Sequence, residues 1–140
     1  MKQVFLDTNI VIDLLADRKP FSIAAAQIFN LAVAGKVKLY ISAVSYNNIY
    51  YLLRQSLSNN ETIKLLNELS EMAEIADVSK AVIKKSLKSE FKDFEDAIQY
   101  HCALSLNKID FIVTRNTKDF KKSVLPVMNA EEAMSIIENE

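Results

Sequence analysis

The chain has 140 residues, half of them apolar, and its 17 basic and 18 acidic side chains leave a formal net charge of -1. These values predict one globular domain spanning residues 1–140 that needs no disulfide or structural metal. The single cysteine, Cys102, excludes a disulfide framework and a multi-cysteine zinc site. No apolar run is long enough for a secretion signal or a membrane span, so we expect a cytoplasmic protein without a membrane partner.

Short strands and helices alternate in the first half of the chain. An apolar run that ends at Asp7 is typical of a buried strand. Gly35 suits the end of a helix, Ser42 can cap the next one, and Ser58 with Glu61 has the spacing of a capping box. The expected elements are a strand at 4–6, helices at 10–16 and 21–34, a strand at 37–41, and helices at 44–57 and 61–72 that form a hairpin.

The second half of the chain continues this alternation. The expected elements are a strand at 74–78, a helix at 80–88 capped by Ser79, a helix from 91 or 93 to 106, strands at 111–114 and 124–128, and a last helix after Asn129. This order predicts an α/β fold, a three-layer α/β/α sandwich around a central, mainly parallel sheet. The ligand site of such a sheet lies beyond the carboxyl ends of its strands.

Acidic and amide side chains fall at the expected carboxyl edge. Asp7 ends the first strand, Asp93 and Asp96 open a helix, and Asn116 and Asp119 follow the fourth strand. Oxygen ligands without His or Cys suit Mg²⁺ or Mn²⁺, which can bridge phosphate oxygens. Each acid could instead be a helix cap or a turn residue, although Asp96 lies inside its helix and is harder to explain in this way.

Three segments, in this order and separation, resemble the signatures of PIN-domain proteins and most closely those of VapC-type toxins. They are residues 5–13 (FLDTNIVID), 93–97 (DFEDA) and 113–120 (VTRNTKDF), and the resemblance extends from Val4 to about Val127. It implies an α/β/α sandwich and a metal-dependent endoribonuclease that cleaves single-stranded RNA. It also implies the toxin of a type II toxin–antitoxin pair, neutralised by an antitoxin whose peptide covers the active groove.

The resemblance also assigns residues. Asp7, Asp96 and Asp119 match the family's metal-binding catalytic acids, with Mg²⁺ or Mn²⁺ as the cofactor. The metal would activate water for attack on the phosphodiester and stabilise the developing charge. Supporting or substrate-binding positions are Asn9, Asn48, Asp93, Thr114, Arg115 and Asn116, with Thr8 or Thr114 able to support an acid by hydrogen bonding.

One position departs from the family pattern. The family places a glutamate in the helix after the second strand, whereas this chain has Asn48 there. An amide oxygen can bind a hard cation but brings no charge, so it should weaken metal binding. A catalytically degenerate PIN domain that binds RNA or a protein is therefore the alternative hypothesis.

Basic and apolar residues leave further alternatives. Arg115, Lys118, Lys121 and Lys122 could contact RNA phosphates or remain solvated, whereas Lys84, Lys85 and Lys88 are expected to be ordinary surface. Tyr46, Tyr50 and Tyr51 are expected to pack rather than stack on bases, and His101 and Cys102 to be packing residues. The apolar positions Ile49, Leu52, Leu53, Leu65, Leu66 and Leu69 would serve a homodimer, an antitoxin helix or the hairpin's own core.

A receiver-like signalling domain is a non-nuclease alternative, because it also gathers acids around Mg²⁺. Its phosphoacceptor should end a central strand, whereas Asp7 ends the first strand and Asp96 lies in a helix. The sequence therefore favours a PIN-domain ribonuclease that forms a homodimer.

Overall fold

A parallel β-sheet lies at the centre of the molecule. The computed structural model describes residues 1–139. Within them, β1 (Lys2–Leu6), β2 (Val37–Ser42), β3 (Glu74–Ala76), β4 (Phe111–Val113) and β5 (Val127–Met128) form one sheet in the order β3-β2-β1-β4-β5. Every strand pair in it is parallel. The predicted α/β sandwich is confirmed, and β1 is the central strand.

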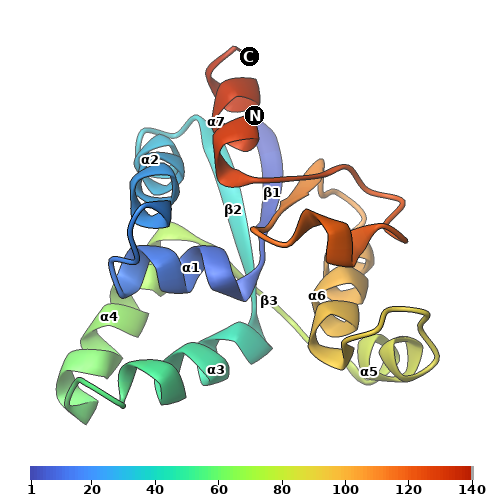
Figure 1. Ribbon diagram of the computed structural model, residues 1–140, viewed down its shortest axis with the longest axis horizontal. Helices are drawn as coiled ribbons and strands as arrows, with labels where there is room; N and C mark the ends of the chain where they lie inside the picture. The colour runs from blue at the N-terminus through green and yellow to red at the C-terminus, as the bar shows by residue number, and fades with distance from the viewer. Residues whose placement is uncertain (140) are drawn as a thin grey trace.

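Helices cover both faces of the sheet. They are α1 (Thr8–Leu15), α2 (Phe21–Val33), α3 (Ala43–Leu53), α4 (Asn59–Met72), α5 (Lys80–Leu87), α6 (Phe94–Ser105) and α7 (Ala130–Glu138). Figure 1 shows α1 to α4 and α7 on one side of the strands and α5 and α6 on the other. This division follows from right-handed crossovers, because the chain runs outward from β1 to β3 and then returns to the opposite side of β1 at β4.

The apolar core is split by the sheet according to strand alternation. Val4 and Leu6 of β1 face the cluster formed with α1 to α4 and α7, while Phe5 between them faces the cluster formed with α5 and α6. Ile112 of β4 likewise faces α6, and its two neighbours in the strand face the other cluster. Successive side chains of a strand point to opposite faces, so both faces of these strands are buried.

Local capping fixes where the helices begin. Ser42 accepts a hydrogen bond from the backbone of Ser45, and the predicted capping box of Ser58 and Glu61 is present. Gly35 follows α2 with a φ of 75°, the left-handed conformation that a helix end requires. The predicted helix starts after Ser42, Ser58 and Ser79 are therefore confirmed to within two residues.

Several predicted boundaries were wrong; the helix predicted at 10–16, for example, spans Thr8–Leu15. The helix predicted at 44–57 ends at Leu53 because the chain tightens into a turn before the extended N-cap residue Ser58. The strand predicted at 74–78 ends at Ala76, since its partner Ser42 is the last residue of β2. The strand predicted at 124–128 begins at Val127, after Pro126, which has no N–H to donate. The helix predicted from 91 or 93 begins at Phe94.

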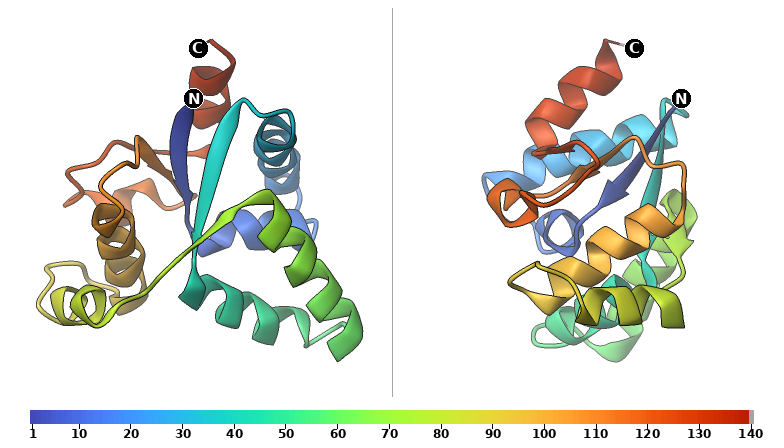
Figure 2. Two further views of the ribbon diagram at one scale, coloured as in Figure 1. Left: turned by 180° about the vertical axis from the view of Figure 1, so that it is seen from behind. Right: turned by 90° about the vertical axis from the view of Figure 1, so that its right-hand side faces the viewer.

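The candidate site lies away from the chain ends. Both the start of β1 and helix α7 lie at one end of the molecule in the two views of Figure 2. The carboxyl ends of the strands, where α1, α3 and α6 begin, lie at the other end. None of the helices in residues 1–139 is long and apolar enough to cross a membrane.

Candidate active site

Asp7 lies at the carboxyl end of β1, beside β4, where the strand order reverses. Open parallel sheets bind ligands at such a reversal. The side chain is 6% exposed, and Oδ1 accepts the backbone N–H of Thr8 at 2.8 Å while Oδ2 accepts the hydroxyl of Thr114 at 2.7 Å. Burial raises the pKa of Asp7, and these two hydrogen bonds oppose the rise. Asp7 is thus both the cap of α1 and a buried carboxylate at the site.

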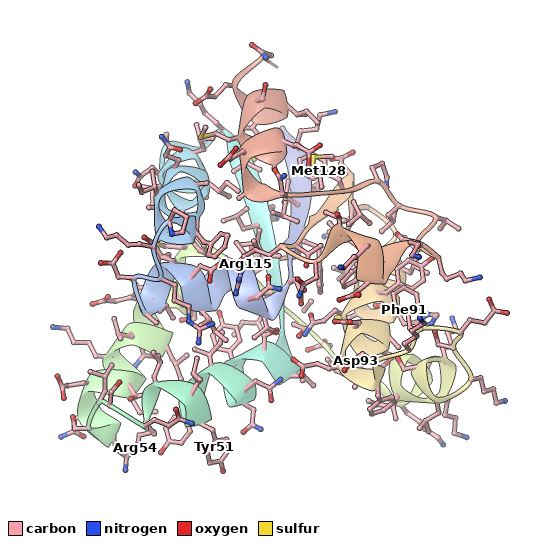
Figure 3. All side chains as sticks on the ribbon, in the orientation of Figure 1. Tyr51, Arg54, Phe91, Asp93, Arg115 and Met128 are labelled. Carbon is pink, nitrogen blue, oxygen red and sulfur yellow. The ribbon has the colours of Figure 1, made fainter. Side chains whose placement is uncertain are left out.

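Asp96 lies in the first turn of α6 and is half-buried. Burial raises its pKa to about 7, and the charges of Asp7, Asp93, Asp119 and Glu95 add to the rise. Asp93 caps α6 by accepting the N–H of Asp96 at 3.0 Å, and Figure 3 shows it at the start of that helix. The structure therefore brings acids from β1, α6 and the segment after β4 into one electrostatic cluster.

Asp119 lies in the short helix η1 (Thr117–Phe120), which is anchored by the buried ring of Phe120. Its backbone N–H donates to the carbonyl of Asn116 at 3.0 Å. The N–H of Asn116 in turn donates to the Thr114 hydroxyl at 3.1 Å, the same hydroxyl that donates to Asp7. Thr114 therefore ties the segment that carries Asp119 to the carboxylate of β1.

The predicted acids line a cleft of about 860 Å³. Lysines and an aromatic side chain share its wall with the acids. The lining residues are Asp7, Thr8, Asn9, Glu90, Phe91, Lys92, Asp93, Glu95, Asp96, Asn116, Lys118, Asp119, Lys121 and Lys122. A cleft lined by both carboxylates and lysines suits a cation and a polyanion that meet at one place.

The donor set fits a hard divalent cation, although its geometry is not closed around one. Within residues 1–139, no three His, Cys, Asp or Glu side chains stand close enough together to form a ready metal-binding group. The donors that face the cleft are carboxylate and amide oxygens, which Mg²⁺ and Mn²⁺ prefer. Besides burial, repulsion from the neighbouring acids raises the pKa of Asp96, and a bound cation would relieve that repulsion.

Asn48 and Glu95 meet across the cleft edge. Asn48 lies midway along α3, and its Nδ2 donates to Oε1 of Glu95 on α6 at 2.9 Å. The charge of Glu95 raises the pKa of both Asp7 and Asp96. No role was predicted for Glu95, although it directly precedes Asp96 in the sequence.

A buried polar network supports the junction of α1, α3 and α6. The hydroxyls of Thr8 and Ser45 lie 2.6 Å apart, and Nε2 of Gln99 donates to them at 3.1 and 3.0 Å. The Thr8 hydroxyl belongs to this network. Of the two threonines predicted to support an acid, only Thr114 bonds to one through its hydroxyl. Gln99 was not predicted, although its position three residues after Asp96 places it on the same helix face.

Arg115 points toward α1 and α2, as Figure 3 shows, and is absent from the cleft lining. Its Nε lies 2.8 Å from Oδ2 of Asp13, which is 1% exposed, and its guanidinium stacks 4.4 Å from the ring centre of Phe21. Its backbone N–H donates to Oδ1 of Asn9 at 3.5 Å. Arg115 therefore holds the turn after β4 against α1, and the predicted contact of this side chain with phosphate is not what the structure displays.

The α3–α4 hairpin buries its own apolar face. Ile49, Leu53 and Leu69 lie in the core. This confirms the alternative in which these apolar positions form the hairpin's own core. Tyr46 packs against the same cluster. Tyr51, labelled in Figure 3, is 65% exposed near the outer end of α3, so the core packing predicted for it is not found within this chain.

His101 and Cys102 do not form a reactive pair. Cys102 is buried, and burial raises the pKa of its thiol to about 12. Burial and the charge of Lys85 lower the pKa of His101, whose ring packs against Tyr100. Both residues are packing residues, as predicted.

The fold and the sequence place the chain in a known family. The family model of the PIN domain matches residues 3–118, so the chain belongs to the PIN-domain family. Because β1 is the central strand, the position of Asp7 does not count against a receiver-like domain, so this step of the sequence argument was wrong. The match to the PIN-domain model distinguishes a PIN domain from a receiver-like domain.

VapC-type proteins are among its relatives. The chain is 25% identical over 136 residues to Ribonuclease VapC1 of Aquifex aeolicus (strain VF5), a match that covers 94% of this chain and 92% of that protein. A toxin–antitoxin complex from Klebsiella pneumoniae contains a chain with 26% identity and a TM-score of 0.67, over 91% of this chain and 97% of that one. VapBC2 of Rickettsia felis, bound to a DNA fragment from its promoter, gives 21% identity and a TM-score of 0.66 over 91% and 98%.

Proposed function

We propose that this protein is a Mg²⁺- or Mn²⁺-dependent endoribonuclease that cleaves single-stranded RNA. The observation that carries the proposal is the cluster of acids from β1, α6 and η1 in one cleft, at the strand-order reversal. The relative from Aquifex aeolicus is a ribonuclease, and its match extends over nearly the whole of both chains. The family, the cleft and this relative support the same chemistry.

The catalytic acids in this proposal are Asp7, Asp96 and Asp119, which would hold the cation. Held by these acids, a divalent cation would supply activation of the attacking water and neutralisation of charge on the phosphate. Thr114 orients Asp7 through its 2.7 Å hydrogen bond, and Asp96 must be ionised to contribute its charge. No covalent intermediate with the enzyme is required.

The remaining predicted positions would support the site or the substrate. The side chains of Asn9 and Asn116 line the cleft and can bind phosphate or sugar oxygens through their amide N–H groups. Asp93 caps α6 and adds negative charge near Asp96. Arg115 acts through its contact with Asp13, by fixing the turn that carries η1. Asn48 would support the site through its hydrogen bond to Glu95.

We also propose that the protein is a cytoplasmic toxin with an antitoxin partner, and that the 140-residue chain forms one domain and a homodimer. Chains of similar fold occur in the toxin–antitoxin complexes of Klebsiella pneumoniae and Rickettsia felis. The outer face of α3 and α4 exposes Tyr51 and Ile63, which supports protein contacts there.

The experiment is cleavage of a mixed-sequence single-stranded RNA by purified protein with Mg²⁺, Mn²⁺ or EDTA. Asp7→Asn keeps an oxygen that can cap α1 but removes the charge, so we expect at least a ~100-fold loss of rate with the fold intact. Glu71→Gln, on the exposed face of α4, is the matched control and should cleave as the wild type does. Cleavage that persists in EDTA would overturn the proposal.

A binding module without cleavage is the second candidate, and Asn48 is the observation that favours it. The carboxylate expected on α3 is absent, which lowers the charge available to a cation. Folded wild-type protein that binds RNA but cleaves none of a varied set with Mn²⁺ present would establish this alternative.

A further inference from the structure

The starting point is the hydrogen bond between α3 and α6. Midway along α3, the amide of Asn48 faces the start of α6. This amide is used as a donor, because its Nδ2 lies 2.9 Å from Oε1 of Glu95. A donor at this place draws the carboxylate of a neighbouring helix toward α3.

Glu95 faces the acid cluster rather than open solvent alone. It lines the same cleft as Asp7 and Asp96, and its charge raises the pKa of both. These two acids come from different elements, β1 and α6, so the Glu95 carboxylate stands within electrostatic reach of both sides of the cluster. With Oε1 engaged by Asn48, the second oxygen, Oε2, is available to a ligand in the cleft.

We infer that Glu95, oriented by Asn48, is a fourth carboxylate of this metal site, beside Asp7, Asp96 and Asp119. The inference rests on the proposed function. The carboxylate comes from α6, and the residue on α3 is the donor that holds it. Glu95 thereby supplies a charged oxygen donor at the edge of the cleft where Asn48 brings no charge.

A purely structural tether between α3 and α6 makes a different prediction. Glu95→Gln retains a side-chain oxygen that accepts from Asn48, so the bond between the helices survives while the charge is lost. If the bond only tethers the two helices, Glu95→Gln should leave cation binding unchanged. If Glu95 is a charged oxygen donor, the same change should weaken cation binding.

The experiment measures Mn²⁺ binding by isothermal titration calorimetry, without RNA. Glu95→Gln should weaken Mn²⁺ binding by about 10-fold or more, the size of effect typical of groups that tune a metal site. Asn48→Glu/Glu95→Gln, which moves the carboxylate to the facing residue on α3, should recover most of that loss. Glu90→Gln is the matched control, because Glu90 lines the same cleft but pairs with Lys122 at 3.5 Å, and it should bind Mn²⁺ as the wild type does.

The outcomes separate the inference from the proposed function. Wild-type affinity in folded Glu95→Gln protein would overturn the inference and leave the metal site standing. A loss that the double variant does not recover would show that the charge at this edge of the cleft is not what binds the cation, and would also overturn the inference. Wild-type protein that binds no Mn²⁺ would overturn the proposed function and the inference together. Circular dichroism and thermal unfolding establish that each variant is folded.

Discussion

Asp96→Asn should stabilise the protein in the absence of metal. The ionised carboxylate of Asp96 is half-buried among four other acids, and its pKa is raised from 3.8 to about 7. Between these values the folded protein holds a proton at Asp96 that the unfolded chain has released. The free energy of unfolding of the wild type therefore falls as the pH rises through this window.

The size of the effect follows from this pKa. The rise to about 7 corresponds to about 4 kcal/mol at ~1.36 kcal/mol per pKa unit, and screening by solvent at this half-buried position reduces it to about 2 kcal/mol. Asn has nearly the same shape and carries no charge. We therefore expect the variant to be more stable than the wild type by about 2 kcal/mol at pH 8 and about 1 kcal/mol at pH 5 in EDTA.

The assay is urea denaturation in EDTA at pH 5 and pH 8, repeated with Mn²⁺ in place of EDTA at pH 8. Mn²⁺ should raise the stability of the wild type and have little effect on Asp96→Asn, because bound ligand stabilises only the state that binds it. Glu71→Gln, exposed on α4, controls for the loss of one carboxylate. A variant no more stable than the wild type at pH 8 in EDTA would refute this reasoning.

Three further changes test the supporting residues. Thr114→Val removes the hydrogen bond to Asp7, so it should lower the free energy of unfolding in urea by about 1–3 kcal/mol and move the onset of Mn²⁺ binding to higher pH. An unmoved onset would contradict the role of the hydroxyl. Arg115→Ala leaves the buried carboxylate of Asp13 unpaired and should cost about 3–5 kcal/mol, whereas an unchanged free energy of unfolding would mean that the contact is not stabilising. Lys121→Ala, in a catalytically inactive background, should lower the slope of log affinity against log salt for single-stranded RNA by about 0.7, and an unchanged slope would place the RNA backbone elsewhere.

The parts of the fold that depend on local chemistry could be predicted from the sequence. The capping box of Ser58 and Glu61 and the left-handed end at Gly35 involve residues within one turn of each other, so their spacing is visible in the chain. The closeness of Asp7 and Thr114 could also be predicted, because both follow strands of a parallel sheet.

Strand lengths could not be predicted because they depend on partners. Val78 extends the alternating pattern of residues 74–78 past Ala76, but β3 stops where Ser42 ends the neighbouring strand β2 and α3 begins. Strand order was also inaccessible, and this is why the central position of β1 was missed. Pairing is a tertiary property that apolar periodicity does not encode.

Side-chain contacts between helices were the main gap at the site. The bond from Asn48 to Glu95 requires the packing of α3 against the start of α6, and neither residue type signals it. Arg115 was expected to contact phosphate or to remain solvated, from its position after β4, but its guanidinium pairs with the buried acid Asp13 on α1. A charge near a site in sequence therefore identifies the region and not the contact.

The central claim is that acids from β1, α6 and η1 gather around one divalent cation. The most direct measurement is anomalous diffraction from crystals soaked in Mn²⁺ at pH 8, where Asp96 is ionised. The account predicts a Mn²⁺ peak in the cleft, in contact with carboxylate oxygens of Asp7, Asp96 and Asp119. Saturating Mn²⁺ that leaves this cleft without a peak, or that binds only elsewhere, would contradict it.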